Sequence, residues 1–475
     1  MNYSILHISD IHRGPGADLN NLFESLVSDT EAYILDGITK PSFVVVSGDI
    51  AEGAKGASAE VEVRKQYREA TDFLIKLTEY FLNGDKSRLI MVPGNHDVFR
   101  GVSESSMEKY IVDDSENVKY LLADTDMRWS WKDLSFYKIK DKGLYKKRFD
   151  LFVEFYNNFY EGRRSIDSNA ETFSTIVDFA EYGVSFALFN SCYQLDHLRY
   201  SGAICPSSVS KLSAELRRLY KEGRLIMGVW HHHTHGLPNE NNYMDYNILQ
   251  SMVANNIHMG LYGHQHVSQI VNHYTDIEEE GEMLLVSSGS LYGGRQQLIT
   301  GCSRQYNVIE INIENRQANI TVNVREDKNP TFDIPDWGLC PLGKKHIRAN
   351  YQKCIALAPL APQDEQLFAL DEHAKNTKDY DTAIRRLYKE YKSNPRYNNL
   401  LDTYLSYTTI PDEEMALILQ HPNSEAQAIM LLNAVENINQ KGYVSQAINE
   451  SYVKNSDSPI VQELRLNLIS KYNLK

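Results

Sequence analysis

Short apolar runs that end in polar side chains recur along much of the chain. These runs occupy residues 4–9, 43–47, 88–92, 225–230 and 257–262. Between the first three runs, apolar positions recur with the spacing of a helix at 18–35 and at 59–81. Strand and helix alternating in this way predict a parallel sheet with helices on its faces.

The same pattern resumes after residue 180. Apolar runs at 184–190 and 283–287 predict further strands, and leucines at helical spacing predict a helix at 208–220. Residues 307–313 and 318–324 alternate apolar and polar positions and are joined by a short polar turn. They therefore predict an antiparallel hairpin.

Residues 101–180 interrupt this pattern and lack a strand rich in valine or isoleucine. Aromatic residues between Phe149 and Phe159 recur with helical spacing, so we predict a helical, aromatic-rich insertion. Within it, residues 132–148 hold seven Lys and Arg against two Asp. Basic residues interleaved with aromatic ones predict a nucleic-acid contact through phosphates and stacked bases. The alternative is that the aromatic side chains form a small core of the insertion itself.

The pattern changes again towards the C-terminus. Five prolines between 326 and 362 predict a linker, or a segment draped over the first domain. Residues 363–475 contain only helical patterns, which predict an all-α C-terminal domain built either as stacked hairpins or as a plain bundle. A repeat-like domain would present an extended surface to a protein partner.

Composition narrows the functional classes. The formal net charge of the 475 residues is −14, so any site for a polyanion must be a local positive patch or a metal centre. The five cysteines are scattered and include no CxxC pair, which argues against a zinc knuckle and suits a reducing compartment. We see neither a secretion leader nor an apolar run near the ~20 residues of a membrane span, so we expect a cytoplasmic protein without a membrane partner.

Metal-ligating side chains follow the apolar runs directly. The candidate ligands are Asp10, His12, Asp49, Asn95, His231, His264 and His266. Carboxylate and imidazole ligands without cysteine suit Mn, Fe or Zn. Seven ligands are too many for one tetrahedral ion, but they suffice for two ions that share a bridging carboxylate. Asp49, at the end of the middle strand, is the natural bridge.

A two-metal site predicts hydrolysis of a phosphoric ester. Two ions clamp the attacking and leaving oxygens of an in-line displacement, and a water bound to both becomes hydroxide near neutral pH. His96 adjoins Asn95 and is the candidate general acid or charge stabiliser, with Asp97 as a candidate to orient its ring. Because four histidines and one threonine follow the strand at 225–230, His232 is an alternative ligand to His231, and His235 a candidate contact for phosphate.

Five motifs occur together in this order: Asp10-x-His12, Gly48-Asp49, Gly94-Asn95-His96-Asp97, His231 and Gly263-His264-x-His266. In this respect residues 1–325 resemble the calcineurin-like metallophosphoesterase superfamily, with 101–180 as an insertion. The resemblance implies a two-sheet α/β-β/α sandwich. A proline of some members is replaced here by His233, which leaves the choice between His231 and His232 open.

The resemblance also implies roles for the candidate residues. Asp10, His12, Asp49 and His266 would hold one metal ion, and Asp49, Asn95, His231 and His264 would hold the other. His96 would be the catalytic histidine. Manganese is the first expectation for both ions, with Fe, Zn or Mg as alternatives.

The leading functional hypothesis is hydrolysis of phosphodiester bonds, in nucleic acid or a nucleotide, by attack of a metal-bound hydroxide. A phosphomonoesterase or protein phosphatase is the alternative. In a third hypothesis, a protein partner bound to residues 363–475 positions the enzyme as an effector.

Overall fold

The computed structural model describes the chain in thirteen stretches. They are residues 1–11, 18–35, 37–113, 116–167, 169–235, 242–274, 281–294, 296–331, 333–342, 348–358, 362–392, 394 and 396–474. The chain divides into two compact units, Met1–Ala358 and Pro359–Lys475. Each unit is described by itself.

The first unit contains a seven-stranded sheet with the order β15-β14-β13-β1-β2-β3, in which β16 also pairs with β14. Its strands are β1 (Asn2–Ile8), β2 (Phe43–Val46), β3 (Leu89–Met91), β13 (Gln305–Glu314), β14 (Gln317–Asp327), β15 (Trp337–Leu339) and β16 (Tyr351–Ala356). Strands β1, β2 and β3 are parallel, whereas β13 is antiparallel to both β1 and β14. The predicted hairpin is therefore confirmed. Its turn residues Asn315 and Arg316 both have positive φ, as a tight two-residue hairpin turn requires.

A six-stranded sheet faces the first one, with the order β11-β12-β10-β9-β8-β7. Its strands are β7 (Ser174–Phe179), β8 (Val184–Phe189), β9 (Leu225–Val229), β10 (Met259–Tyr262), β11 (Ile270–Tyr274) and β12 (Glu282–Ser287). Strands β8, β9, β10 and β12 run parallel to one another. Their side chains alternate between two faces, and one face packs with the first sheet into a shared core that contains Val45 and Met227.

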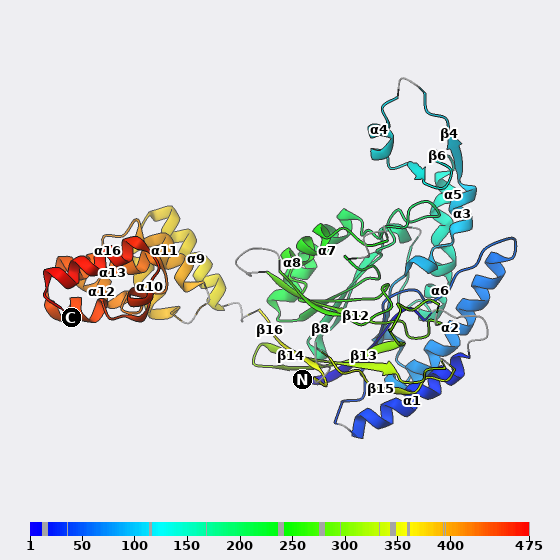
Figure 1. Ribbon diagram of the computed structural model, residues 1–475, viewed down its shortest axis with the longest axis horizontal. Coiled ribbons are helices and arrows are strands. Elements are labelled where there is room, and N and C mark those ends of the chain that lie inside the picture. Colours follow the sequence, from blue (N-terminus) through cyan, green and yellow to red (C-terminus); the bar gives the residue numbers. More distant parts are fainter. Residues whose placement is uncertain are drawn as a thin grey trace. The chain divides into compact units, whose positions relative to one another are not determined.

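Helices cover the two outer faces of this sandwich (Figure 1). Helices α1 (Leu19–Leu35), α2 (Ala59–Leu82) and α6 (Asp150–Tyr160) pack on the first sheet in one apolar cluster. Helices α7 (Pro206–Lys221) and α8 (Asn247–Ala254) pack on the second sheet in another. The predicted α/β-β/α sandwich is confirmed. Short 3-10 turns are η1 (Lys86–Arg88), η2 (Asn95–Asp97), η3 (Lys147–Phe149), η4 (Ala170–Thr172) and η5 (Ala180–Tyr182).

The insertion combines helices with a small sheet. Its elements before α6 are α3 (Arg100–Ser105), β4 (Met107–Tyr110), α4 (Val118–Ala123), β5 (Met127–Ser130), β6 (Ser135–Ile139) and α5 (Lys142–Lys146). The predicted aromatic helix is α6, and its Phe155 stacks on Tyr67 of α2. The prediction omitted the antiparallel sheet β4-β6-β5, because its strands are short and rich in polar and aromatic residues, with Ile139 as their one valine or isoleucine.

The proline-rich segment after residue 326 belongs to the first unit as far as Ala358. Strand β14 continues to Asp327, and β15 pairs with its end at Glu326↔Gly338. Strand β16 pairs with the other half of β14, from Gln317↔Ala356 to Val322↔Tyr351. Of the two alternatives for this segment, the structure therefore has the one that lies against the first domain.

The second unit is helical throughout its described residues. Its helices are α9 (Pro362–Thr377), α10 (Tyr380–Glu390), α11 (Tyr397–Leu405), α12 (Asp412–Ile418), α13 (Glu425–Ile438), α14 (Lys441–Ala447), α15 (Ser451–Asn455) and α16 (Pro459–Lys471). One apolar core runs from Leu367 to Leu468. The predicted all-α domain is confirmed. Among the described residues of the whole chain, no helix has the length and apolar character needed to cross a membrane.

Candidate metal centre

The candidate ligands meet where parallel strands of both sheets end. Asp10 follows β1, Asp49 follows β2, and Asn95 begins the turn η2 after β3. From the facing sheet, His231 follows β9 and His264 follows β10. Because parallel strands end at the same edge of their sheet, residues distant in sequence are brought together there.

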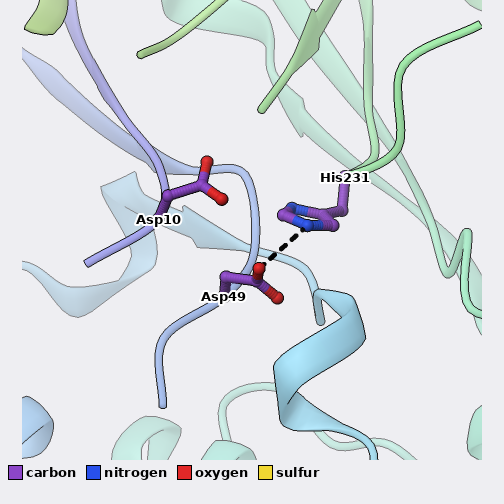
Figure 2. A group of neighbouring side chains, drawn as sticks. All are labelled: Asp10, Asp49 and His231. Carbon is purple, nitrogen blue, oxygen red and sulfur yellow. Dashed lines mark ion pairs between the residues drawn. The ribbon is translucent and has the colours of Figure 1, made fainter. Parts of the chain in front are cut away.

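Asp10, Asp49 and His231 form the centre of this cluster (Figure 2). Each offers one ligand atom, and these atoms all lie within 4.8 Å of one another. His231 Nε2 is 3.2 Å from Asp49 Oδ2. All three side chains are buried. Two carboxylates buried together are costly unless a cation compensates their charge.

Three further candidates join the cluster through their side chains. Asn95 Oδ1 lies 3.1 Å from His231 Nε2 and 2.9 Å from His264 Nδ1. His266 Nε2 lies 3.2 Å from Asp10 Oδ1. The structure thus brings six of the seven sequence-predicted ligands into one network. The seventh, His12, lies outside the described residues.

The histidine rings turn their lone pairs towards the cluster. His231 Nδ1 lies 2.8 Å from the carbonyl oxygen of Ser47, and His266 Nδ1 lies 2.5 Å from that of Gln297. A carbonyl only accepts, so Nδ1 of each ring is the donor. In a neutral ring, Nε2 is then an acceptor that faces carboxylate or amide oxygens. Such an arrangement requires a proton or a metal cation between the acceptors, and carbonyl-oriented imidazoles are typical of metal sites.

The protonation behaviour of the rings fits this requirement. Burial lowers the pKa of His231, but the nearby Asp49 and Asp10 carboxylates raise it to about 9. Burial and the proximity of His231 lower the pKa of His264 to about 3. Among the described residues, His264 Nε2 is buried and has no hydrogen-bond partner. A neutral imidazole with an unpartnered buried nitrogen is suited to metal ligation.

The separations within the cluster also suit a cation. Two ligand atoms that each lie about 2.1 Å from one ion, in roughly perpendicular directions, are about 3.0 Å apart. His231 Nε2 lies 3.1 Å from Asn95 Oδ1 and 3.2 Å from Asp49 Oδ2. The residues present therefore fit divalent metal ions.

The backbone around the cluster is strained. Asp10, Asp49, His264 and His266 have φ values of 51°, 52°, 77° and 54°, in the left-handed region that side-chain-bearing residues rarely adopt. Each such residue costs about 1–3 kcal/mol. Gly94 relieves one contact, since a Cβ there would lie 2.1 Å from Asp49 Oδ1. Strain concentrated at four candidate ligands indicates a functional site.

His96 lies beside Asp49 in a fixed orientation. Its backbone N–H donates to Asp49 Oδ1 at 2.8 Å, and its Nδ1 lies 2.6 Å from the carbonyl oxygen of Glu52. Nδ1 is therefore the donor, and proton transfer by this ring would use Nε2. Sequence analysis missed the role of Glu52, because a backbone carbonyl carries no residue-type signal.

Asp97 does not orient His96, contrary to the expectation from sequence. Its carboxylate accepts hydrogen bonds from the backbone of Gly94, Ile50 and Ala51 and from the Tyr67 hydroxyl. Burial and the neighbouring Asp49 raise its pKa to about 6. Asp97 therefore connects the loop after β2 with the loop after β3.

The structure also distinguishes the consecutive histidines. His231 contacts Asp49 and Asn95, whereas His232 Nδ1 lies 2.9 Å from Ser191 Oγ. The His232 ring is 4.6 Å from the His264 ring, so it lies next to the cluster. His235 packs by its ring against Tyr246, at 5.7 Å. The geometry favours His231 over His232 as a ligand.

The basic window 132–148 is less available than its sequence suggests. Arg148 is fully buried and pairs with Glu171 at 2.6 Å. Lys142 pairs with Asp126 and Lys140 with Glu108, at 2.5 and 3.6 Å. All three acidic partners lie outside the window, so a local charge count could not include them. Lys132, Lys146 and Lys147 are exposed.

Strands of two facing sheets deliver carboxylate, amide and imidazole ligands to one edge, an arrangement suited to a metal-dependent hydrolase of phosphoric esters. Residues 3–268 match the profile of the calcineurin-like phosphoesterases. The chain belongs to this family, whose members use divalent metal ions.

Two solved structures are similar to the chain at low identity. A dimetal phosphatase from Danio rerio is 11% identical, with a TM-score of 0.40, and the match covers 75% of this chain and 99% of that one. Vps29 from Chaetomium thermophilum is 10% identical, with a TM-score of 0.29 and coverages of 75% and 100%. A comparison with curated protein sequences gives no match.

Proposed function

We propose that the first unit hydrolyses phosphodiesters of nucleic acids or nucleotides with the help of two divalent ions, manganese first among them. The observation that supports this most directly is the position of Asp49. Its Oδ2 lies 3.2 Å from His231 Nε2, its Oδ1 accepts the backbone N–H of His96, and its ligand atom lies within 4.8 Å of that of Asp10. A carboxylate between two groups of ligands is suited to bridge two ions.

The ligands divide around Asp49. Asp10 and His266, with His12, would hold one ion, and Asn95, His231 and His264 would hold the other, with Asp49 shared. When bound, the ions supply a water acidic enough to attack near neutral pH and stabilise charge on the phosphoryl oxygens. The carbonyls of Ser47 and Gln297 hold the His231 and His266 rings in the ligating tautomer.

His96 would deliver the proton that the departing alkoxide needs. The Glu52 carbonyl keeps a proton on Nδ1, so the ring would act as an acid in its doubly protonated form and transfer the proton of Nε2. The hydrogen bond from the His96 backbone to Asp49 fixes the distance between this acid and the bridging carboxylate. Positioned general acids contribute about 10²–10⁴-fold to rate.

The preference for diesters over monoesters rests on the insertion. It contributes exposed Lys132, Lys146 and Lys147, and Trp131 is 80% exposed at the turn between β5 and β6. Cations and exposed aromatic rings suit a polymer of phosphates and bases more than a small monoester. Replacing the three lysines with glutamine should weaken binding of single-stranded DNA at low salt, and unchanged affinity would argue for the monoesterase.

The test of the main proposal uses full-length protein stripped of metal and reloaded with manganese. We expect manganese-dependent turnover of bis(4-nitrophenyl) phosphate to exceed that of 4-nitrophenyl phosphate and to be lost in Asp49→Asn. Asp72→Asn, the same change on the outer helix α2, is the matched control and should keep full activity. Preference for the monoester would establish a phosphatase instead, and failure to bind metal would refute the proposal.

We also propose that the second unit binds a basic, amphipathic segment of a protein partner. A groove of about 200 Å³ lies between α12, α13 and α14 and is lined by Leu417, Tyr443 and Glu413. Leu417 and Tyr443 are 57% and 42% exposed. Residues 397–463 carry nine Asp and Glu against two Lys, a formal charge of −7. A groove with both apolar and polar walls in an acidic surface complements apolar side chains flanked by Lys or Arg.

The probe for this second proposal is a helical peptide of alternating leucine and lysine pairs, added to the full chain. The double substitution Leu417→Ser and Tyr443→Ser should abolish its binding. Leu466→Ser, which changes a leucine of similar exposure on α16, is the matched control. Binding that is absent, or that survives the double substitution, would rule out the groove.

A further inference from the structure

Two arginines beside the metal centre lack a carboxylate partner. Among the described residues, the guanidinium groups of Arg100 and Arg199 form no ion pair. Arg100 lies over the ring of Tyr200, 5.1 Å from its centroid, and Arg199 donates to the amide oxygen of Gln194 at 2.5 Å. By contrast, the nearby Arg128 and Arg148 pair with Asp196 and Glu171.

The loop that carries Arg199 and Tyr200 begins and ends at the metal centre. It leaves from Ser191, whose hydroxyl accepts hydrogen bonds from the backbone of both His231 and His232, at 3.1 Å each. It returns at Ala203, whose backbone N–H donates to the Ser191 carbonyl. Gly202 packs so closely on the His232 ring that a Cβ there would lie 2.3 Å from its Cγ. Residues 192–203 therefore form a rim next to the candidate ligands.

Arg100 reaches this rim from the segment that follows β3. It is the first residue of α3 and follows Asn95 by five residues, so it is at most about 18 Å from that ligand along the chain. Two contacts tie α3 to the loop: the Arg100–Tyr200 pair and the approach of Ser103 Oγ to His197 Nδ1 at 3.2 Å. The rim thus connects the side that carries His96 with the side that carries His232.

A buried polar network holds the rim in place. Asp196, at the middle of the loop, accepts hydrogen bonds from Arg128 at 2.6 Å and from the Tyr145 hydroxyl at 2.9 Å. Arg148 donates to the Leu195 carbonyl at 3.0 Å. These residues of the insertion engage the carboxylate of Asp196, which forms no ion pair with the Arg199 guanidinium. The insertion therefore fixes the loop, and within the described part of the chain Arg199 keeps no carboxylate in direct contact with its guanidinium.

The chemistry of the rim suits an additional anionic group of the substrate. Guanidinium groups bind phosphate oxygens through paired, charge-assisted hydrogen bonds. Burial and the proximity of Arg128 lower the pKa of Arg199, so an anion bound there would relieve an unfavourable environment. Tyr200 is 51% exposed, and an exposed ring can stack on a base or sugar.

We propose that Arg100 and Arg199 bind a phosphate adjacent to the scissile one, with Tyr200 packing on the intervening nucleoside. This inference rests on the proposed phosphoesterase function and deepens it. It specifies the substrate class as nucleotides or oligonucleotides with more than one phosphate, in preference to small esters with a single phosphate.

The test compares the dinucleotide TpT with pTpT, which differs by a 5′-terminal phosphate. Equilibrium binding to the full-length, manganese-loaded protein is measured with a phosphorothioate linkage that resists hydrolysis, and KM and kcat are measured with the natural linkage. We expect the wild type to bind pTpT about tenfold more tightly than TpT, the effect of one charge-assisted contact. Arg100→Gln and Arg199→Gln should each reduce this ratio towards one, mainly through KM.

Two further variants separate the contribution of the Tyr200 ring from that of the arginine charges. Tyr200→Leu should weaken both dinucleotides alike, because it removes a stacking surface and no charge. Arg217→Gln, on the outer helix α7, is the matched control and should leave the ratio at the wild-type value. Equal affinity of the wild type for both dinucleotides, or a ratio that persists in both arginine variants, would overturn the inference.

The binding measurement keeps the two proposals apart. If the wild type prefers pTpT and the arginine variants lose that preference, the rim is established even where no turnover is seen. If turnover of diesters is seen without any preference for the added phosphate, the phosphodiesterase stands and the rim proposal fails.

Discussion

The imidazole of His231 and the carboxylate of Asp49 face one another at 3.2 Å, Nε2 to Oδ2, although they come from different sheets. The Ser47 carbonyl fixes the far side of the ring, and the backbone of His96 donates to the other oxygen of Asp49. These two hydrogen bonds therefore fix the orientation of both side chains, and their ligating atoms, Nε2 and Oδ2, point towards each other. Preorganisation of this kind favours a metal ion that enters between them.

His231→Ala should lower the metal content of the chain, whereas His232→Ala should not. The lost ligand leaves Asp49, Asn95 and His264 to hold one ion, so we expect one of two ions to be lost, together with about 10² or more of kcat/KM. Metal analysis of purified protein after dialysis gives the stoichiometry. The opposite outcome, with loss of metal in His232→Ala alone, would transfer the ligand role to the neighbouring ring.

Removing metal should destabilise the first unit. Without a cation, the buried carboxylates of Asp10 and Asp49 remain close together. A ligand at a hundredfold excess over its Kd stabilises the folded state by about 2.7 kcal/mol, which corresponds to about 3–4 °C in Tm for a unit of this length. Thermal unfolding with manganese and with a chelator measures this shift.

Asp49→Asn provides the control for that measurement. It removes the shared ligand, so the Tm of its first unit should respond little to manganese. An equal response in Asp49→Asn and the wild type would mean that manganese stabilises the protein at some other site.

Much of the fold follows from local pattern, and the rest depends on contacts distant in sequence. Apolar runs such as 43–47 and 225–230 are short, bounded and separated by helical spacing, so the strands that carry Asp49 and His231 could be predicted. The sheet of the insertion could not, because its strands are short and lack an apolar run, and β4 pairs with β6 across more than twenty residues. Strands β15 and β16 were not predicted, because the prolines between and around them indicated a linker instead of a sheet.

The candidate ligands could be proposed because ligand chemistry depends on residue type and on the ends of strands. The residues that orient the histidine rings could not be proposed from sequence. Ser47, Glu52 and Gln297 act through their backbone carbonyls, which carry no signal of residue type. The charge count of residues 132–148 overstated the number of free cations, because it could not include partners distant in sequence. Arg148 is a cation in a basic window by sequence, yet its partner Glu171 lies beyond that window.

Arg148→Gln should therefore destabilise the first unit instead of weakening nucleic-acid binding selectively. The guanidinium is fully buried, pairs with Glu171 and donates to the carbonyls of Leu195 and Tyr145. Breaking a buried pair by removing one partner costs about 3–5 kcal/mol. Urea unfolding should show this loss, whereas the exposed neighbour Lys147→Gln should change stability by less than about 0.5 kcal/mol. Equal stabilities of the two variants would contradict the buried pair.

Gly94→Ala should damage the metal centre without removing any ligand. A Cβ at this position would lie 2.1 Å from Asp49 Oδ1 and 2.2 Å from the Asp49 backbone nitrogen, so the carboxylate must move. A displacement of about 1 Å at a catalytic group costs on the order of 10² in rate. We expect weaker manganese binding and a loss of kcat of that size, measured by titration of metal-free protein and by diester turnover.

Gly101→Ala is the matched control for this substitution, since it makes the same change seven residues further along. Its Cβ would meet nothing closer than 3.8 Å, and the position lies in α3, where alanine is favoured over glycine. Metal binding and turnover should therefore match the wild type in Gly101→Ala. Wild-type behaviour of Gly94→Ala would mean that the loop after β3 shifts to accommodate the methyl group while Asp49 stays in place. The close contact of Gly94 with the Asp49 carboxylate would then not be what positions that ligand.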